Sequence, residues 1–143
     1  MTGPVLFAYD GSAQARAAIH QAAEQLRNGR PAIVLTVWHA LAVVPFPTAG
    51  GLTSEGLEDS IEQQAQRVAE EGAELARSGG FDAEPVAEQG DPVWQRIVDY
   101  AKERDAGIVV MGSHARTGIG LVLLGSVAAA TARHTDRPVL IAH

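Results

Sequence analysis

The sequence predicts an α/β fold with three α/β/α layers, in which helices cover both faces of a five-stranded parallel sheet. Two observations support this doubly wound, Rossmann-like arrangement. Short apolar runs alternate with longer amphipathic stretches in the order β-α-β-α-β-α-β-α-β. Strands joined by helices in this way form parallel sheets buried on both faces. The 143 residues also suit one compact unit, so we expect a single domain over residues 1–143.

The first half of the chain is expected to hold two strands and two helices. Residues 5–9 and 32–38 are apolar runs that predict buried strands. Ser12 can cap a helix over residues 13–27, and residues 40–56 are rich in Pro and Gly, as a long loop would be. The next helix begins at Ser54 or Leu57 and ends at Arg77. Its expected inward face is Leu57, Ile61, Ala65, Val68, Gly72 and Leu75.

The second half continues the alternation. Residues 81–88 predict a third strand, and Asp91 followed by Pro92 predicts an N-cap and the first position of a helix. The buried stripe of that helix is Val93, Ile97, Val98 and Ala101. The remaining expected elements are a strand at 108–111, a helix at 126–134 and a strand at 138–142.

Composition and charge exclude several classes of function. The formal net charge is −6 and no cluster of Lys or Arg stands out, so no nucleic-acid partner is expected. No apolar run reaches the roughly 18 residues that a membrane helix needs. The chain has no cysteine, which excludes disulfides and thiolate metal sites and is consistent with a cytoplasmic protein. The five histidines lack the spacing of metal ligands, so no metal site is expected.

Two loops are candidates for a ligand site. In doubly wound sheets, ligands bind beyond the carboxyl ends of the strands, where the strand order reverses. Asp10, Gly11 and Ser12 follow the first strand, and the segment GSHARTGIGLVLLGS at 112–126 follows the fourth. Gly112 would allow close approach of a ligand, while Arg116 and the amides at residues 125–126 would attract an anion. The alternative is a glycine-rich connection that ends in an ordinary serine cap.

Other nucleotide-binding motifs do not fit the segment 112–126. A Walker A loop needs a lysine after its last glycine, but Ser126 follows Gly125. A G-x-G-x-x-G fingerprint is absent because Leu123 stands where the third glycine would be. A phosphoacceptor receiver domain is also a poor match, because Asp10 has no acidic neighbour at its strand end. His114 has no evident serine or acidic partner in the sequence, so we interpret it as a loop histidine.

Five short motifs together resemble the universal stress protein family over essentially the whole chain. They are Asp10-Gly11-Ser12, Gly90-Asp91-Pro92, residues 111–114, residues 125–127 and residues 137–141. The ATP-binding branch of that family carries the pattern G-x2-G-x9-G-[S/T]. Gly112, Ala115 and Gly125-Ser126 reproduce its spacing, with Ala115 in place of the second glycine. The added methyl either crowds a phosphate or is harmless where φ is negative; because only one small residue is changed, we expect binding to be retained.

The resemblance implies a set of site residues. It places Asp10 against the ribose or base, Ala8 and the strand end Val37-Trp38 beside the adenine, and Met111 in the wall of its pocket. The residues it places around the ribose and phosphates are Gly112, Ser113, Ala115, Arg116, Thr117, Gly125, Ser126 and Val127, with His114 and Gly118 in the same segment.

The resemblance also implies a function. It suggests a regulatory protein of the stress response that binds ATP, with or without Mg²⁺, and forms a homodimer through residues 138–142. Slow hydrolysis could follow from held and polarised phosphates, but no general base or arginine finger is evident, so an enzyme is not expected. The alternatives are a genuine ATPase and a nucleotide-free dimeric scaffold of the same fold.

Overall fold

The computed structural model describes residues 3–26, 28–39, 54–113, 115–116, 122–123 and 125–143. Its helices are α1 (Ala13–Gln25), α2 (Ser54–Ser78), α3 (Val93–Glu103) and α4 (Ser126–His134). Its strands are β1 (Val5–Ala8), β2 (Pro31–Trp38), β3 (Asp82–Gln89), β4 (Ile108–Gly112), β5 (Ala115–Arg116), β6 (Val122–Leu123) and β7 (Val139–Ala142). None of the helices in these ranges combines the length and apolar character needed to cross a membrane.

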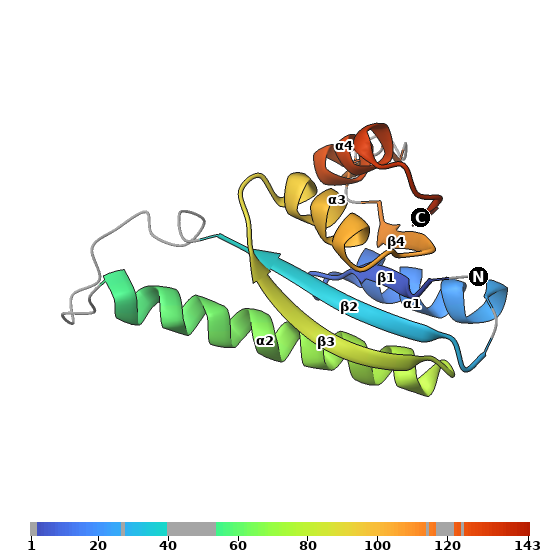
Figure 1. Ribbon diagram of the computed structural model, residues 1–143, viewed down its shortest axis with the longest axis horizontal. Helices are drawn as coiled ribbons and strands as arrows, with labels where there is room; N and C mark the ends of the chain where they lie inside the picture. Colours follow the sequence, from blue (N-terminus) through green and yellow to red (C-terminus); the bar gives the residue numbers. More distant parts are fainter. Residues whose placement is uncertain (1–2, 27, 40–53, 114, 117–121, 124) are drawn as a thin grey trace.

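Five strands form one parallel sheet in the order β3-β2-β1-β4-β7, which confirms the predicted fold class. Helices α1 and α2 cover one face, and α3 and α4 cover the other (Figure 1). The chain moves outward from β1 through β2 to β3, and then returns to place β4 on the other side of β1. The strand order therefore reverses between β1 and β4, where this class of sheet opens a crevice.

The sequence suggested that the segment 112–126 is a loop, but it also contains two short strands. These strands, β5 and β6, pair antiparallel through Ala115 with Leu123 and Arg116 with Val122. Each strand has two residues, which is too short for an alternating pattern to reveal in a sequence.

The inward face of α2 agrees with the predicted one only in part, at Ala65 and Gly72, which are buried. Its buried positions are Ala65, Ala69, Gly72, Ala73 and Ala76. Of the larger predicted residues, Ile61, Val68 and Leu75 are only half-buried, and the side chain of Leu57 lies outside the described part. Small residues occupy these positions because they let the helix approach the sheet closely. A Cβ at position 72 would lie 2.7 Å from Cδ2 of Tyr9 and from Cγ1 of Val34.

The predicted helix starts had mixed outcomes. The Ser12 cap is confirmed, since its Oγ accepts a hydrogen bond of 3.1 Å from the amide of Ala15. The cap predicted at Asp91 is wrong, because α3 begins at Val93 with Pro92 as its N-cap and without a side-chain hydrogen bond. Pro92 has an extended backbone with ψ 157°, so it precedes the helix instead of forming its first position.

Candidate functional site

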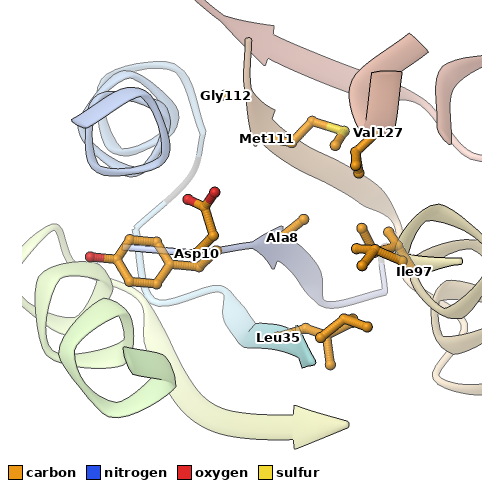
Figure 2. Close-up of a pocket in the computed structure, with 10 residues that line it drawn as sticks. Ala8, Asp10, Leu35, Ile97, Met111, Gly112 and Val127 are labelled. Carbon is orange, nitrogen blue, oxygen red and sulfur yellow. The ribbon is translucent and has the colours of Figure 1, made fainter. Parts of the chain in front are cut away.

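A cavity of about 200 Å³ lies at the carboxyl ends of β1, β2 and β4, beside the starts of α3 and α4 (Figure 2). Its position is the point where the strand order reverses. The described residues that line it are Ala8, Tyr9, Asp10, Leu35, Val37, Val93, Ile97, Met111, Gly112 and Val127.

Apolar side chains form most of the cavity. Ala8 lies in register with Leu35 of β2 and Met111 of β4, so these three residues form a floor across three strands. Ile97 of α3 and Val127 of α4 supply the facing wall, and Figure 2 shows all five side chains around one space. Because Ala8 carries only a methyl group, the middle of the floor stays open. An apolar slot of this kind suits the flat face of an aromatic ring.

Of the lining residues that the structure describes, Asp10 alone is charged. It is exposed and lies two residues after the end of β1, on a turn in which Gly11 has a φ of +82°. Its Oδ1 accepts a hydrogen bond of 3.0 Å from the amide of Ser12. Figure 2 shows its carboxylate rising from the end of β1 on the Gly112 side of Ala8. The arrangement places a hydrogen-bond acceptor at the rim of an apolar slot.

Gly112 is small for a reason that the sequence did not reveal. It ends β4 and has no positive φ. A Cβ at this position would lie 2.6 Å from the carbonyl carbon of Gln14 and 2.7 Å from its oxygen, in the first turn of α1. The glycine therefore lets α1 begin directly against the end of β4. The expected approach of a ligand to this glycine stays a prediction.

The start of α4 lies beside the cavity, with Val127 in its wall. The N-cap is Gly125, and no side chain makes a capping hydrogen bond there. The alternative interpretation, in which a glycine-rich connection ends in a serine cap, therefore does not hold for Ser126. The first amides of a helix have no partner within the helix, and the helix dipole favours an anion there. Ser126 is exposed at this end.

The predicted site residues fall into three groups. Six of them line the cavity: Ala8, Asp10, Val37, Met111, Gly112 and Val127. Four lie at neighbouring strand or helix ends: Trp38 ends β2, Ser113 follows β4, and Gly125 and Ser126 begin α4. Ala115 and Arg116 form β5, with their side chains outside the described part, and His114, Thr117 and Gly118 are outside the described residues.

Four lining residues were missed by the sequence analysis: Tyr9, Leu35, Val93 and Ile97. Leu35 lies two residues before Val37 and so shares its face of β2, which is a signal that the sequence does hold. Val93 and Ile97 belonged to the predicted buried stripe of α3, but that pattern does not separate cavity walls from filled core. In the described part of the chain, no group of acidic or histidine side chains could hold a metal ion.

Behind the cavity, Tyr9 belongs to the apolar core between the sheet and α1 and α2. Burial raises the pKa of its phenol above 10.0, so the hydroxyl is neutral at physiological pH and can donate a hydrogen bond. The bond from this hydroxyl, and after it the bond from Arg16, lower the pKa of Glu71 from 4.5. The carboxylate of Glu71 is therefore ionised and accepts from both side chains.

Comparisons with known proteins agree with the fold. The model of the universal stress protein family matches residues 1–143. Universal stress protein YxiE of Bacillus subtilis is 30% identical over 152 residues, covering 99% of each chain. A universal stress protein structure from Archaeoglobus fulgidus is 25% identical, covers 100% of both chains and has a TM-score of 0.74. A second structure from that organism, in complex with dAMP, is 24% identical, covers 99% of this chain and 98% of the other, and has a TM-score of 0.67. The chain belongs to the universal stress protein family.

Proposed function

We propose that this protein binds an adenine nucleotide, with ATP as its ligand, in the cavity between β1 and β4. In this role it is a nucleotide-responsive module of the stress response, built as one domain over residues 1–143 and acting in the cytoplasm. One observation carries the proposal. An apolar slot, the Asp10 carboxylate and the start of α4 meet at the point where the strand order reverses.

The size of the cavity favours partial enclosure of the ligand. Complete small-molecule sites usually occupy roughly 300–1,000 Å³, whereas this cavity measures about 200 Å³. We therefore propose that the slot takes the base only. The ribose and phosphates then lie over the rim, in contact with polar groups.

The rim offers suitable partners for these parts. The Asp10 carboxylate can accept hydrogen bonds from ribose hydroxyls. The first amides of α4 and the Ser126 hydroxyl can donate to phosphate oxygens, with the helix dipole in the favourable direction. A net charge of −6 does not oppose this, because the contacts are local and made largely by backbone groups.

Ala115 is compatible with retained binding. It lies in β5, where it pairs with Leu123. Strand residues have negative φ, which any L-residue adopts, so the backbone there does not require a glycine. We propose that the added methyl group is tolerated.

Adenine derivatives are the appropriate first probes. The family member from Archaeoglobus fulgidus that was solved with dAMP shares the fold of this chain. Among the described residues that line the cavity, Asp10 is the only carboxylate, and none is a histidine or lysine that could act as a general base. We therefore propose binding and regulation, with Mg²⁺ accompanying the phosphates and at most slow hydrolysis.

We also propose a homodimer through the last strand. β7 is at one edge of the parallel sheet, and Val139, Leu140 and Ile141 stay half-buried there. An apolar edge strand favours pairing with another strand, which a second copy of the chain would supply. Sedimentation at micromolar concentration should give twice the mass of 15.0 kDa, and a clean monomer would contradict the dimer without affecting the nucleotide site.

Thermal unfolding with and without millimolar ATP and Mg²⁺ tests the nucleotide proposal. A free ligand at a thousand times its dissociation constant stabilises the folded state by about 4 kcal/mol. GTP at the same concentration is the control for effects of charge and ionic strength. An equal rise of the unfolding midpoint with both nucleotides would contradict recognition of adenine. No rise with either would contradict nucleotide binding and favour the alternative of a nucleotide-free scaffold. Phosphate release above the no-protein rate, lost in Asp10→Asn, would instead favour a genuine ATPase.

A further inference from the structure

One carboxylate oxygen connects three elements behind the cavity. Oε1 of Glu71, on α2, accepts a hydrogen bond of 2.9 Å from the hydroxyl of Tyr9. The same oxygen accepts from Nε and Nη2 of Arg16 at 3.0 and 2.8 Å. Tyr9 follows β1 directly, and Arg16 lies in the first turn of α1. Glu71 therefore joins α2 to both sides of the turn that carries Asp10.

Tyr9 is fixed at every polar group. Its amide donates to the carbonyl of Leu35 at 2.9 Å, and its carbonyl accepts from the hydroxyl of Thr36 at 2.9 Å. The residue as a whole is only 3% exposed, and the absence of a side chain at Gly72 makes room for the ring. Since Asp10 is the next residue, the position of Tyr9 determines where the turn begins.

The other end of the turn is fixed by α1. The amide of Ser12 donates to Oδ1 of Asp10 at 3.0 Å, and the hydroxyl of Ser12 caps the helix. The amide of Arg16 donates to the carbonyl of Ser12 at 3.1 Å. The two attachments of the turn, through Tyr9 and through Arg16, thus meet at Glu71.

The exposure of this pair argues against a role in stability alone. The side chains of Arg16 and Glu71 are 49% and 46% exposed, and ion pairs in such positions contribute little to folding. A comparable pair stands beside it on α2, where Arg77 lies 3.4 Å from Glu70 with exposures of 44% and 49%. The two ion pairs, Arg16–Glu71 and Arg77–Glu70, differ in the parts of the fold that they connect. Only the Glu71 pair reaches the turn that carries Asp10, which makes Glu70 a matched control.

We propose that Glu71 is a positioning residue of the nucleotide site. Through Tyr9 and Arg16 it holds the turn that presents Asp10 to the ligand, and so couples α2 to the affinity of the cavity. This inference rests on the proposed nucleotide binding, but its effect on the turn exists without ligand.

Amide hydrogen exchange in the ligand-free protein tests the effect on the turn. Glu71→Ala should speed exchange of the Ser12 amide several-fold, whereas Glu70→Ala should leave it unchanged. Both substitutions introduce a good helix former at exposed positions of α2, so the fold should persist. Tyr9→Phe removes only the hydroxyl and should reproduce part of the effect. Unchanged Ser12 exchange in both Glu71→Ala and Tyr9→Phe would overturn the inference, whatever the ligand does.

Calorimetric titration with ATP and Mg²⁺ then tests the effect on affinity. Asp10→Asn and Glu71→Ala should each weaken binding by about tenfold, and the double variant by little more than either one, because coupled residues are not additive. If the losses of affinity in the two single variants multiply in the double variant, the two residues act independently. That result would overturn the positioning role of Glu71 but not the nucleotide site. Absence of ATP binding by the unaltered protein would overturn the proposed function, and with it this role in affinity. Glu70→Ala should bind like the unaltered protein.

Discussion

Filling the cavity from its floor should separate ligand binding from folding. Ala8 is the last residue of β1, and its methyl group faces the space between Met111, Ile97 and Leu35 (Figure 2). Ala8→Leu places three further carbon atoms in that space. The cavity of about 200 Å³ has room for them without displacing the surrounding side chains. The larger side chain would then occupy the position proposed for the base.

The two expected effects have opposite signs. Burying a methylene-sized group stabilises a protein by about 0.8 kcal/mol, so the ligand-free variant should gain up to about 2 kcal/mol. For a chain of this length, that raises the midpoint of unfolding by a few degrees. A base that enters the filled slot must force side chains apart at a cost of about 1–3 kcal/mol, which weakens binding by roughly fivefold to more than a hundredfold.

Differential scanning calorimetry with and without ATP measures both effects in one protein. Ala32→Leu is the matched control, because Ala32 is 2% exposed in the adjacent strand and does not line the cavity. That substitution should destabilise the fold by about 1–3 kcal/mol through overpacking. If Ala8→Leu retains the full response to ATP, the base does not occupy this cavity. If it destabilises the ligand-free protein as much as Ala32→Leu does, the cavity is not open in solution.

Three further predictions concern the rim, the packing of α2 and pH. Gly125→Glu puts a negative charge at the proposed phosphate position, so calorimetry should detect no ATP binding while circular dichroism stays unchanged; tight binding would show that this helix start does not hold phosphates. Gly72→Ala should cost about 1–3 kcal/mol in urea unfolding, because its Cβ would meet the buried ring of Tyr9. Because the pKa of Glu71 is lowered from 4.5, its contribution to stability is fully present above that pH and is lost as the pH falls through the lower folded value. The stability difference between the parent and Glu71→Ala should therefore be constant near neutral pH and shrink below about pH 4.5; growth on acidification would contradict this assignment.

The sheet was predictable because its signals are local. The runs that form β1, β2 and β4 are apolar, and Ser12 stands at the first helix start, where its hydroxyl can cap the helix. The inward face of α2 was harder to predict. Ala65 and Gly72 were expected there and are buried, but the larger residues expected beside them are not, because close approach to the sheet selects small ones such as Ala69 and Ala73.

The candidate site was predictable only in part, for two physical reasons. A buried stripe on a helix has the same pattern whether it fills a core or walls a cavity, so Val93 and Ile97 were interpreted as core. The contact between Tyr9 and Glu71 joins residues that are 62 positions apart. Such a contact depends on how α2 crosses the sheet, and no local pattern encodes that geometry.

Titration of the ¹⁵N-labelled protein with ATP, followed by amide chemical shifts, tests nucleotide binding at this cavity most directly. Saturable shifts are expected at Ala8, Asp10, Met111 and Val127, which come from separate parts of the chain but meet at one cavity. GTP at equal concentration should move them much less. The absence of saturable shifts, or shifts confined to residues remote from this cavity, would contradict the proposed site.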